Sequence, residues 1–251
     1  MLEPVAAASL AVVAAAVGLF IGTVGVGGVL LIPFLVLLGG LGIHSAAATA
    51  LFTFLFTGLL GSWLYQKRGS IDWRLALPVC AGAVPFGYLG ASAAAKVDSR
   101  PLTLTIAAII VAAGIHVLRP ARAAGAPRQG RGSREMGVLF AIGAASGFGA
   151  GLSGAGGPLF SVPLMVILGF APLAAVGVSQ VLQILAATSG SLASMQDGRI
   201  AYGIAAWVTL FELAGVVAGV RLAHAVSARA LRRMAAALCI AVGGFMLVRT
   251  L

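Results

Sequence analysis

Charged side chains are scarce in this chain. Only 9% of its 251 residues are Asp, Glu, Lys or Arg, whereas 61% are hydrophobic and the mean hydropathy is +1.10. Soluble globular domains carry about 25% charged residues, so this composition excludes that class. The shortage of charge predicts an all-α polytopic membrane protein.

Cysteine and the motifs of enzymes are also nearly absent. The two cysteines, Cys80 and Cys239, lie inside apolar runs without the spacing of metal ligands, so we expect them to be small core residues with no redox role. The glycine-rich segments lack the lysine of a phosphate-binding loop. No Ser, His and Asp set or metal-ligand cluster is recognisable. We therefore expect no enzyme activity, no metal and no cofactor.

The N-terminal part of the chain has no basic residue before Lys67. A secretory signal peptide begins with a basic region, so we expect no cleaved leader. The chain as a whole still carries a net charge of +10. Such an excess can mark a nucleic-acid surface, but no aromatic residue interrupts the basic run from Arg119 to Arg134. We expect no nucleic acid partner, and we interpret residues 120–134 as a cytoplasmic linker that contacts anionic lipid headgroups.

Long apolar runs fill most of the chain. A helix that spans a bilayer needs about 20 predominantly apolar residues. Six runs meet this requirement, namely Ile43 to Tyr65, Leu75 to Ala95, Leu102 to Leu118, Leu173 to Met195, Tyr202 to Ala223 and Leu231 to Val248.

Two further apolar segments are interrupted by glycine and proline. They contain GTVGVGGVLLIP (Gly22 to Pro33) and GLSGAGGPLFSVP (Gly151 to Pro163). In a helix interior glycine costs about 1 kcal/mol and proline about 3 kcal/mol, so neither segment favours an unbroken helix. We expect each to form a re-entrant hairpin or two short crossings, within Val5 to Gly40 and Met136 to Gly169.

The two motifs belong to an internal repeat. A shift of 129 positions aligns Gly25 with Gly154 and Gly27 with Gly156, and the same shift matches glycines along both halves. Such a repeat is typical of transporters. It predicts an N-terminal repeat (1–119) and a C-terminal repeat (135–251), each with one broken hairpin segment and three transmembrane helices.

The distribution of charge predicts how the repeats are oriented. If each broken segment enters and leaves on one side, twelve basic residues face the cytoplasm and four face outward, whereas single crossings would give ten and six. The first division obeys the positive-inside rule better. It inverts the two repeats relative to each other and places both termini in the periplasm. The outward residues are Lys96, Arg100, Arg199 and Arg249.

The glycines at the breaks are candidates for an anion site. Irregular backbone at membrane depth must be buried or line a cavity, and a helix that begins there directs free N–H groups and a positive dipole end at an anion. The alternative is that the glycines only allow close helix packing. The candidate substrate-binding residues of the two breaks are Gly25, Gly27, Gly28, Ser153, Gly154, Gly156 and Gly157.

Polar residues follow each break on the next helix. Thr49 and Thr53 lie four positions apart and share a face, and Gln180 and Gln183 form a similar pair. Their hydroxyl and amide groups could donate to substrate oxygens, which adds these four residues to the candidate binding site. The alternative is that both glutamines hydrogen-bond a neighbouring helix.

Glu212 is the one acidic residue well inside an apolar run. Intramembrane carboxyl groups often relay protons, so Glu212 is a candidate for proton coupling. The alternative is a neutral carboxyl group bonded to a backbone carbonyl.

The paired motifs resemble the sulfite exporter TauE/SafE family of membrane permeases. The likeness includes the polar helices and a Gly-x-Ile turn at Gly69 to Ile71 and at Gly198 to Ile200, and it extends from about Val5 to Val248. The first motif departs in having Val29 where the second has Pro158. The resemblance implies transport of a small anion, sulfite or an organosulfur anion such as a sulfonate, across the bacterial inner membrane.

The resulting hypothesis is a secondary transporter that works by alternating access at a midplane site. Its expected partners are a small anion, the lipid bilayer and a coupling ion, which could be a proton or sodium. An anion channel with the same pocket and a non-transporting membrane scaffold are the alternatives. The sequence leaves open the identity of the anion, the direction of transport and the oligomeric state.

Overall fold

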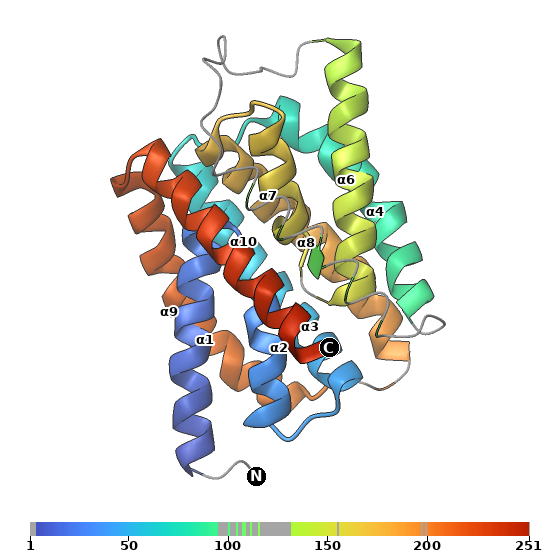
Figure 1. Cartoon of the computed structure of the whole chain (residues 1–251), viewed down its shortest axis with the longest axis vertical. Coiled ribbons are helices and arrows are strands. Elements are labelled where there is room, and N and C mark those ends of the chain that lie inside the picture. The colour runs from blue at the N-terminus through green and yellow to red at the C-terminus, as the bar shows by residue number, and fades with distance from the viewer. Residues whose placement is uncertain are drawn as a thin grey trace.

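The computed structural model of the protein describes residues 4–94, 132–154, 156–196, 198 and 200–250, with a few positions between 100 and 115. All elements in these ranges are α-helices, gathered into one bundle (Figure 1). In chain order they are α1 (Pro4–Val24), α2 (Gly28–Leu37), α3 (Ile43–Lys67), α4 (Trp73–Ala94), α6 (Ser133–Ser153), α7 (Pro158–Ile167), α8 (Pro172–Gln196), α9 (Tyr202–Ala225) and α10 (Ala228–Thr250).

Six of these helices are long and apolar enough to cross a membrane, namely α1, α3, α4, α6, α8 and α9. The multi-pass, all-helical class predicted from the sequence is therefore confirmed. Four predicted spans coincide with α3, α4, α8 and α9. The predicted span from Leu231 to Val248 lies within α10. Most of the predicted span from Leu102 to Leu118 and most of the predicted linker, 120–134, lie outside the described residues.

Each broken segment divides unequally. Helices α1 and α6 have 21 residues each, whereas α2 and α7 have 10. At 1.5 Å per residue, 10 residues rise about 15 Å, half of a hydrocarbon core about 30 Å thick. Each segment was expected to form a re-entrant hairpin or two short crossings. The structure shows one helix of span length followed by one of half that length, so two equally short crossings are not formed. The reason is that the glycines stand two thirds of the way along each segment.

The helix boundaries recur along the chain. The starts of α6, α8 and α9 follow those of α1, α3 and α4 by 129 positions each. Packing recurs in the same way, because α1 packs on α9 along one flank of the bundle and α6 packs on α4 along the other (Figure 1). Each broken segment thus lies against a helix of the other half. Inversion of the halves across a membrane, and their division at 1–119 and 135–251, stay predictions.

Glycines make these two flanks possible. A methyl group on Gly18 would collide with the carbonyl oxygen of Glu212, and one on the equivalent Gly147 would collide with that of Ala83. Small residues let membrane helices approach closely, which is the packing role considered as an alternative for the glycines. In this structure the packing role applies to glycines that lie one to two helical turns before the breaks. The same collision is found for Gly22, Gly90, Gly151 and Gly219.

Candidate functional site

The first break follows α1. Gly25 has a φ of +75°, a conformation that L side chains rarely adopt, and its N–H donates to the carbonyl oxygen of Ile21 over 3.0 Å. Two residues later, Gly27 precedes α2, which begins at Gly28. Only glycine takes the left-handed conformation without steric cost, so Gly25 fixes where α1 ends.

The second break repeats this geometry. Gly154 has a φ of +67° and its N–H donates to the carbonyl oxygen of Ala150 over 2.8 Å, while Gly156 has a φ of +86°. Gly157 then precedes α7, whose first residue is Pro158. Proline suits this position because its missing N–H has no partner in the first turn anyway. Just before the break, the Ser153 hydroxyl donates to the carbonyl oxygen of Gly149 over 2.6 Å.

The two breaks lie next to elements of the opposite half. A methyl group placed on Gly25 would come within 3.5 Å of Cβ of Pro158 and within 3.0 Å of the Ser179 hydroxyl oxygen. One placed on Gly154 would contact Ala47 of α3. The structure therefore places the first break next to the start of α7. From the sequence, this proximity was indicated only indirectly, through the repeat of the two motifs.

The start of α7 combines a polar backbone with an apolar surround. The first N–H groups of a helix lack intrahelical partners and carry the positive end of its dipole. Phe54 lies beside Gly156, and Leu182 lies beside Gly157. The hydroxyl oxygen of Ser161, in this first turn, is buried and has no hydrogen-bond partner among the described residues. Sequence reasoning missed Phe54 and Ser161, because neither stands out in an apolar run.

Side chains of two other helices bind the carbonyl groups at the end of α1. The Gln180 amide donates to the carbonyl oxygen of Ile21 over 2.9 Å, and the Tyr65 hydroxyl donates to that of Gly22 over 2.8 Å. The last carbonyl groups of a helix lack partners within the helix; the Ile21 carbonyl also accepts from the Gly25 N–H, whereas the Tyr65 hydroxyl is the donor recorded for Gly22 among the described residues. Gln180 thus makes the interhelical bond considered as its alternative role. Tyr65, a buried tyrosine within an apolar run, was missed at the sequence level.

Gln183 also uses its amide between helices. Its nitrogen donates to the carbonyl oxygen of Phe54 over 3.1 Å and to the Thr57 hydroxyl over 2.8 Å. An amide nitrogen has two hydrogens, so both are engaged in this conformation. The Thr53 hydroxyl donates to the carbonyl oxygen of Ala50 over 2.8 Å. Thr49 accepts from the N–H of Ala201 over 3.0 Å and so holds the start of α9. Contact of these side chains with an anion stays a prediction.

Glu212 is completely buried on α9, with α1 packed against its backbone at Gly18. Neither carboxyl oxygen has a hydrogen-bond partner among the described residues. The Thr53 side chain of α3 lies within interaction range, although its hydroxyl is directed to Ala50. The bond to a backbone carbonyl considered as the alternative for Glu212 is not formed. A buried polar group without a partner is costly, so its presence calls for an explanation such as a functional role.

Comparisons with known proteins agree with this architecture. The family model described as Sulfite exporter TauE/SafE matches residues 10–246. Among curated proteins of Bacillus subtilis (strain 168), "Probable membrane transporter protein YunE" is 26% identical, with 75% of this chain and 80% of the relative covered. "Probable membrane transporter protein YdhB" is 24% identical, with 81% of this chain and 85% of the relative covered. No solved structure gives a significant match.

The family model covers both glycine breaks and all six span-length helices described above, apart from the first turns of α1. The resemblance predicted from the two motifs is therefore confirmed, and the chain belongs to the TauE/SafE sulfite exporter family of multi-pass membrane transporters.

Proposed function

We propose that the chain is a secondary transporter of a small anion, sulfite or an organosulfur anion such as a sulfonate, in the bacterial inner membrane. The observation that carries this proposal is the position of Gly25 against Pro158, which brings the first glycine break to the start of α7. A site built there recognises negative charge through backbone N–H groups and a helix dipole. No covalent chemistry is required.

The strength of such a site suits transport. A helix dipole contributes about 0.3 to 1 kcal/mol at exposed sites and up to about 2 kcal/mol when partly buried. No Lys or Arg is among the candidate binding residues of the two breaks. An anion held by dipoles and neutral donors can leave again, whereas a buried ion pair with a cation would hold it. Alternating access then requires that the helices around the breaks move relative to each other.

Glu212 is the proposed site of proton coupling. Glu212 lies where α9 meets α1, and the Thr53 side chain of α3 is close enough to interact with its carboxyl group. A carboxyl group that exchanges its proton between two conformations of these helices could link anion movement to a proton gradient. The contact between α9 and α1 joins the two halves, so a change of charge there would affect their packing.

A ligand screen of the purified protein tests the substrate class. A ligand that binds only the folded state raises apparent stability, by about 2.7 kcal/mol at 100 times its Kd. We expect sulfite or a small sulfonate to raise the unfolding temperature more than sulfate, thiosulfate or chloride at equal ionic strength. Equal shifts for all anions would indicate an ionic-strength effect and contradict the proposal.

Flux measurements separate the carrier from the two alternatives. In proteoliposomes, a carrier shows saturable uptake that is stimulated when the same anion is present on the opposite side. An anion channel would instead give unitary currents in a planar bilayer without such stimulation. A scaffold would show neither flux nor a ligand-dependent thermal shift.

A further inference from the structure

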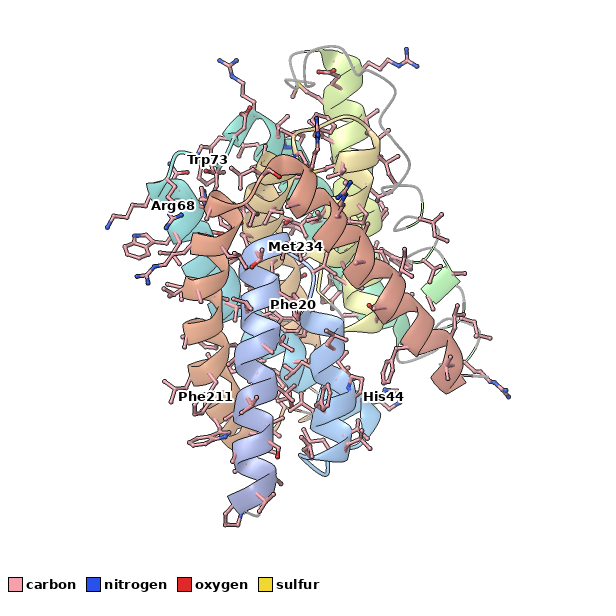
Figure 2. All side chains as sticks on the ribbon, turned by 60° about the vertical axis from the view of Figure 1, so that its left-hand side comes forward. Phe20, His44, Arg68, Trp73, Phe211 and Met234 are labelled. Atoms are coloured by element: carbon pink, nitrogen blue, oxygen red, sulfur yellow. The ribbon has the colours of Figure 1, made fainter. Side chains whose placement is uncertain are left out.

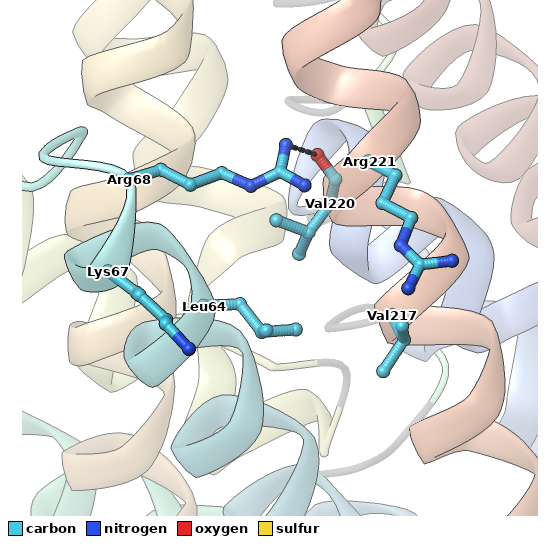
Figure 3. Close-up of a pocket in the computed structure, with 6 residues that line it drawn as sticks. All are labelled: Leu64, Lys67, Arg68, Val217, Val220 and Arg221. Atoms are coloured by element: carbon cyan, nitrogen blue, oxygen red, sulfur yellow. Dashed lines mark hydrogen bonds between the residues drawn. The ribbon is translucent and has the colours of Figure 1, made fainter.

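A pocket of about 330 Å³ lies between the ends of α3 and α9. Figure 3 shows that its side chains come from the last turn of α3 and from one face of α9. The lining residues are Leu64, Lys67, Arg68, Val217, Val220 and Arg221.

Three of these six side chains are cationic and none is acidic. The Arg68 guanidinium donates to the carbonyl oxygen of Val220 over 3.4 Å, which anchors one of its nitrogens on the pocket wall. A guanidinium has five N–H donors, so most of them remain for a ligand. The same carbonyl accepts from Nδ1 of His224 over 2.7 Å, which fixes this turn of α9. Cations contributed by both helices therefore surround one volume.

The pocket also has the position and the apolar surface of a lipid site. It lies where two span-length helices end, next to the end of the bundle where Figure 2 labels Arg68 and Trp73. Trp63 is 58% exposed, with its ring centre 5.1 Å from the Lys67 ammonium group. Exposed tryptophans and lysines mark the boundary between lipid and water. Leu64, Val217 and Val220 add apolar surface to the same lining.

We propose that this pocket binds the phosphate group of an anionic phospholipid. Basic pockets between transmembrane helices at the cytoplasmic side take such headgroups. The volume favours a headgroup with adjoining chain segments over a small free anion, because a single water occupies about 30 Å³ and a lone phosphate would leave most of the pocket unfilled. The phosphate lies between the three cations, and an acyl chain follows Leu64 and Val217 toward the hydrocarbon.

Such a lipid would connect the two halves beside the first break. Val220 lines the pocket, and its backbone nitrogen lies 3.0 Å from a methyl group placed on Gly22 of α1. Tyr65, between lining residues of α3, donates to the carbonyl oxygen of the same glycine. A bound headgroup holds these α3 and α9 turns together, and through them the end of α1.

Native mass spectrometry of the purified protein tests the assignment. Phosphatidylglycerol is titrated in detergent and compared with phosphatidylcholine, with inorganic phosphate added in a separate arm. Each basic residue near a lipid surface contributes an affinity factor of about fivefold. We expect Lys67→Gln, Arg68→Gln and Arg221→Gln each to weaken phosphatidylglycerol binding by about fivefold. The matched control is Arg74→Gln. Arg74 is an exposed cation in the first turn of α4, which follows α3 in the chain, and it does not line the pocket.

A second variant separates the pocket from general attraction to negative lipid. Val217→Phe narrows the pocket and leaves every charge in place, so it should weaken binding as well. If the charge variants and Val217→Phe bind phosphatidylglycerol as the wild type does, the pocket is not the site. If inorganic phosphate competes fully with the lipid, the source of the phosphate is not a lipid and the assignment is wrong. Neither result bears on anion transport, because lipid binding is measured without flux.

Discussion

The Tyr65 hydroxyl donates a hydrogen bond of 2.8 Å to the carbonyl oxygen of Gly22, three residues before the chain turns at Gly25. This bond joins α3 to the last turn of α1, and the Tyr65 side chain that makes it is completely buried. It satisfies a carbonyl group that the helix itself leaves without a donor. The first break is therefore held by a side chain 43 residues away in the sequence.

Removing this hydroxyl should destabilise the protein. Tyr65→Phe leaves the Gly22 carbonyl buried without a partner, which costs about 1 to 3 kcal/mol. We expect a lower unfolding temperature in detergent, measured by differential scanning fluorimetry. The matched control is Tyr88→Phe, because Tyr88 is 50% exposed. If both variants unfold at the wild-type temperature, the Tyr65 bond does not hold the end of α1.

The packing of α6 on α4 predicts a contrast between two glycines of one helix. Gly147→Ala places a methyl group against the carbonyl oxygen of Ala83 and should cost about 1 to 3 kcal/mol through overpacking. Gly137→Ala meets nothing within 4 Å and should be neutral or gain up to about 1 kcal/mol in helix propensity. Thermal unfolding of the two variants measures the difference. Equal stabilities would mean that α6 and α4 are not in close contact at Gly147.

The sequence predicted the breaks because their causes are local. Glycine and proline disfavour a helix wherever they stand, so GTVGVGG and GLSGAGGP located Gly25 and Gly154 without any tertiary information. The repeat was visible for the same reason, since one shift of 129 positions aligns both motifs.

The partners of polar side chains could not be predicted, because they depend on how distant helices meet. Gln183 bonds Thr57 across 126 positions, and Gln180 bonds Ile21 across 159. In the sequence, Lys67 and Arg221 served only in the count of charges that predicts the orientation of the chain in the membrane. The structure places both in the lining of one pocket.

Glu212→Gln tests proton coupling. The amide cannot exchange a proton, so we expect anion flux in proteoliposomes to lose its dependence on an imposed pH gradient while anion binding stays close to wild type. Glu135→Gln is the control, because Glu135 is in the first turn of α6, at the end of a span-length helix. A Glu212→Gln protein whose flux follows the pH gradient as the wild type does would assign coupling to another group.

Cysteine labelling tests the orientation predicted from charge. In a background with both native cysteines replaced, Gly42→Cys lies in the connection between α2 and α3, where a side chain meets nothing within 4 Å. We expect an impermeant maleimide to label it from outside intact cells. Arg74→Cys and Arg128→Cys should react only after the membrane is permeabilised. Strong labelling of either arginine position in intact cells would reverse the orientation.

Two variants of similar backbone strain test whether an anion binds at the glycine breaks. Gly156 and Gly169 have φ values of +86° and +92°, so a leucine at either position carries a similar cost of about 1 to 2 kcal/mol. A side chain at Gly156 enters the space beside Phe54 and the start of α7, whereas a Cβ at Gly169, between α7 and α8, meets nothing within 4 Å.

The decisive measurement is the affinity of both folded variants for the anion that most stabilises the wild-type protein, determined by isothermal titration calorimetry. We expect that Gly156→Leu no longer binds this anion and that Gly169→Leu binds it as the wild type does. Wild-type affinity in Gly156→Leu would contradict an anion site at the breaks, because the glycines would then serve helix packing alone and the anion would bind elsewhere.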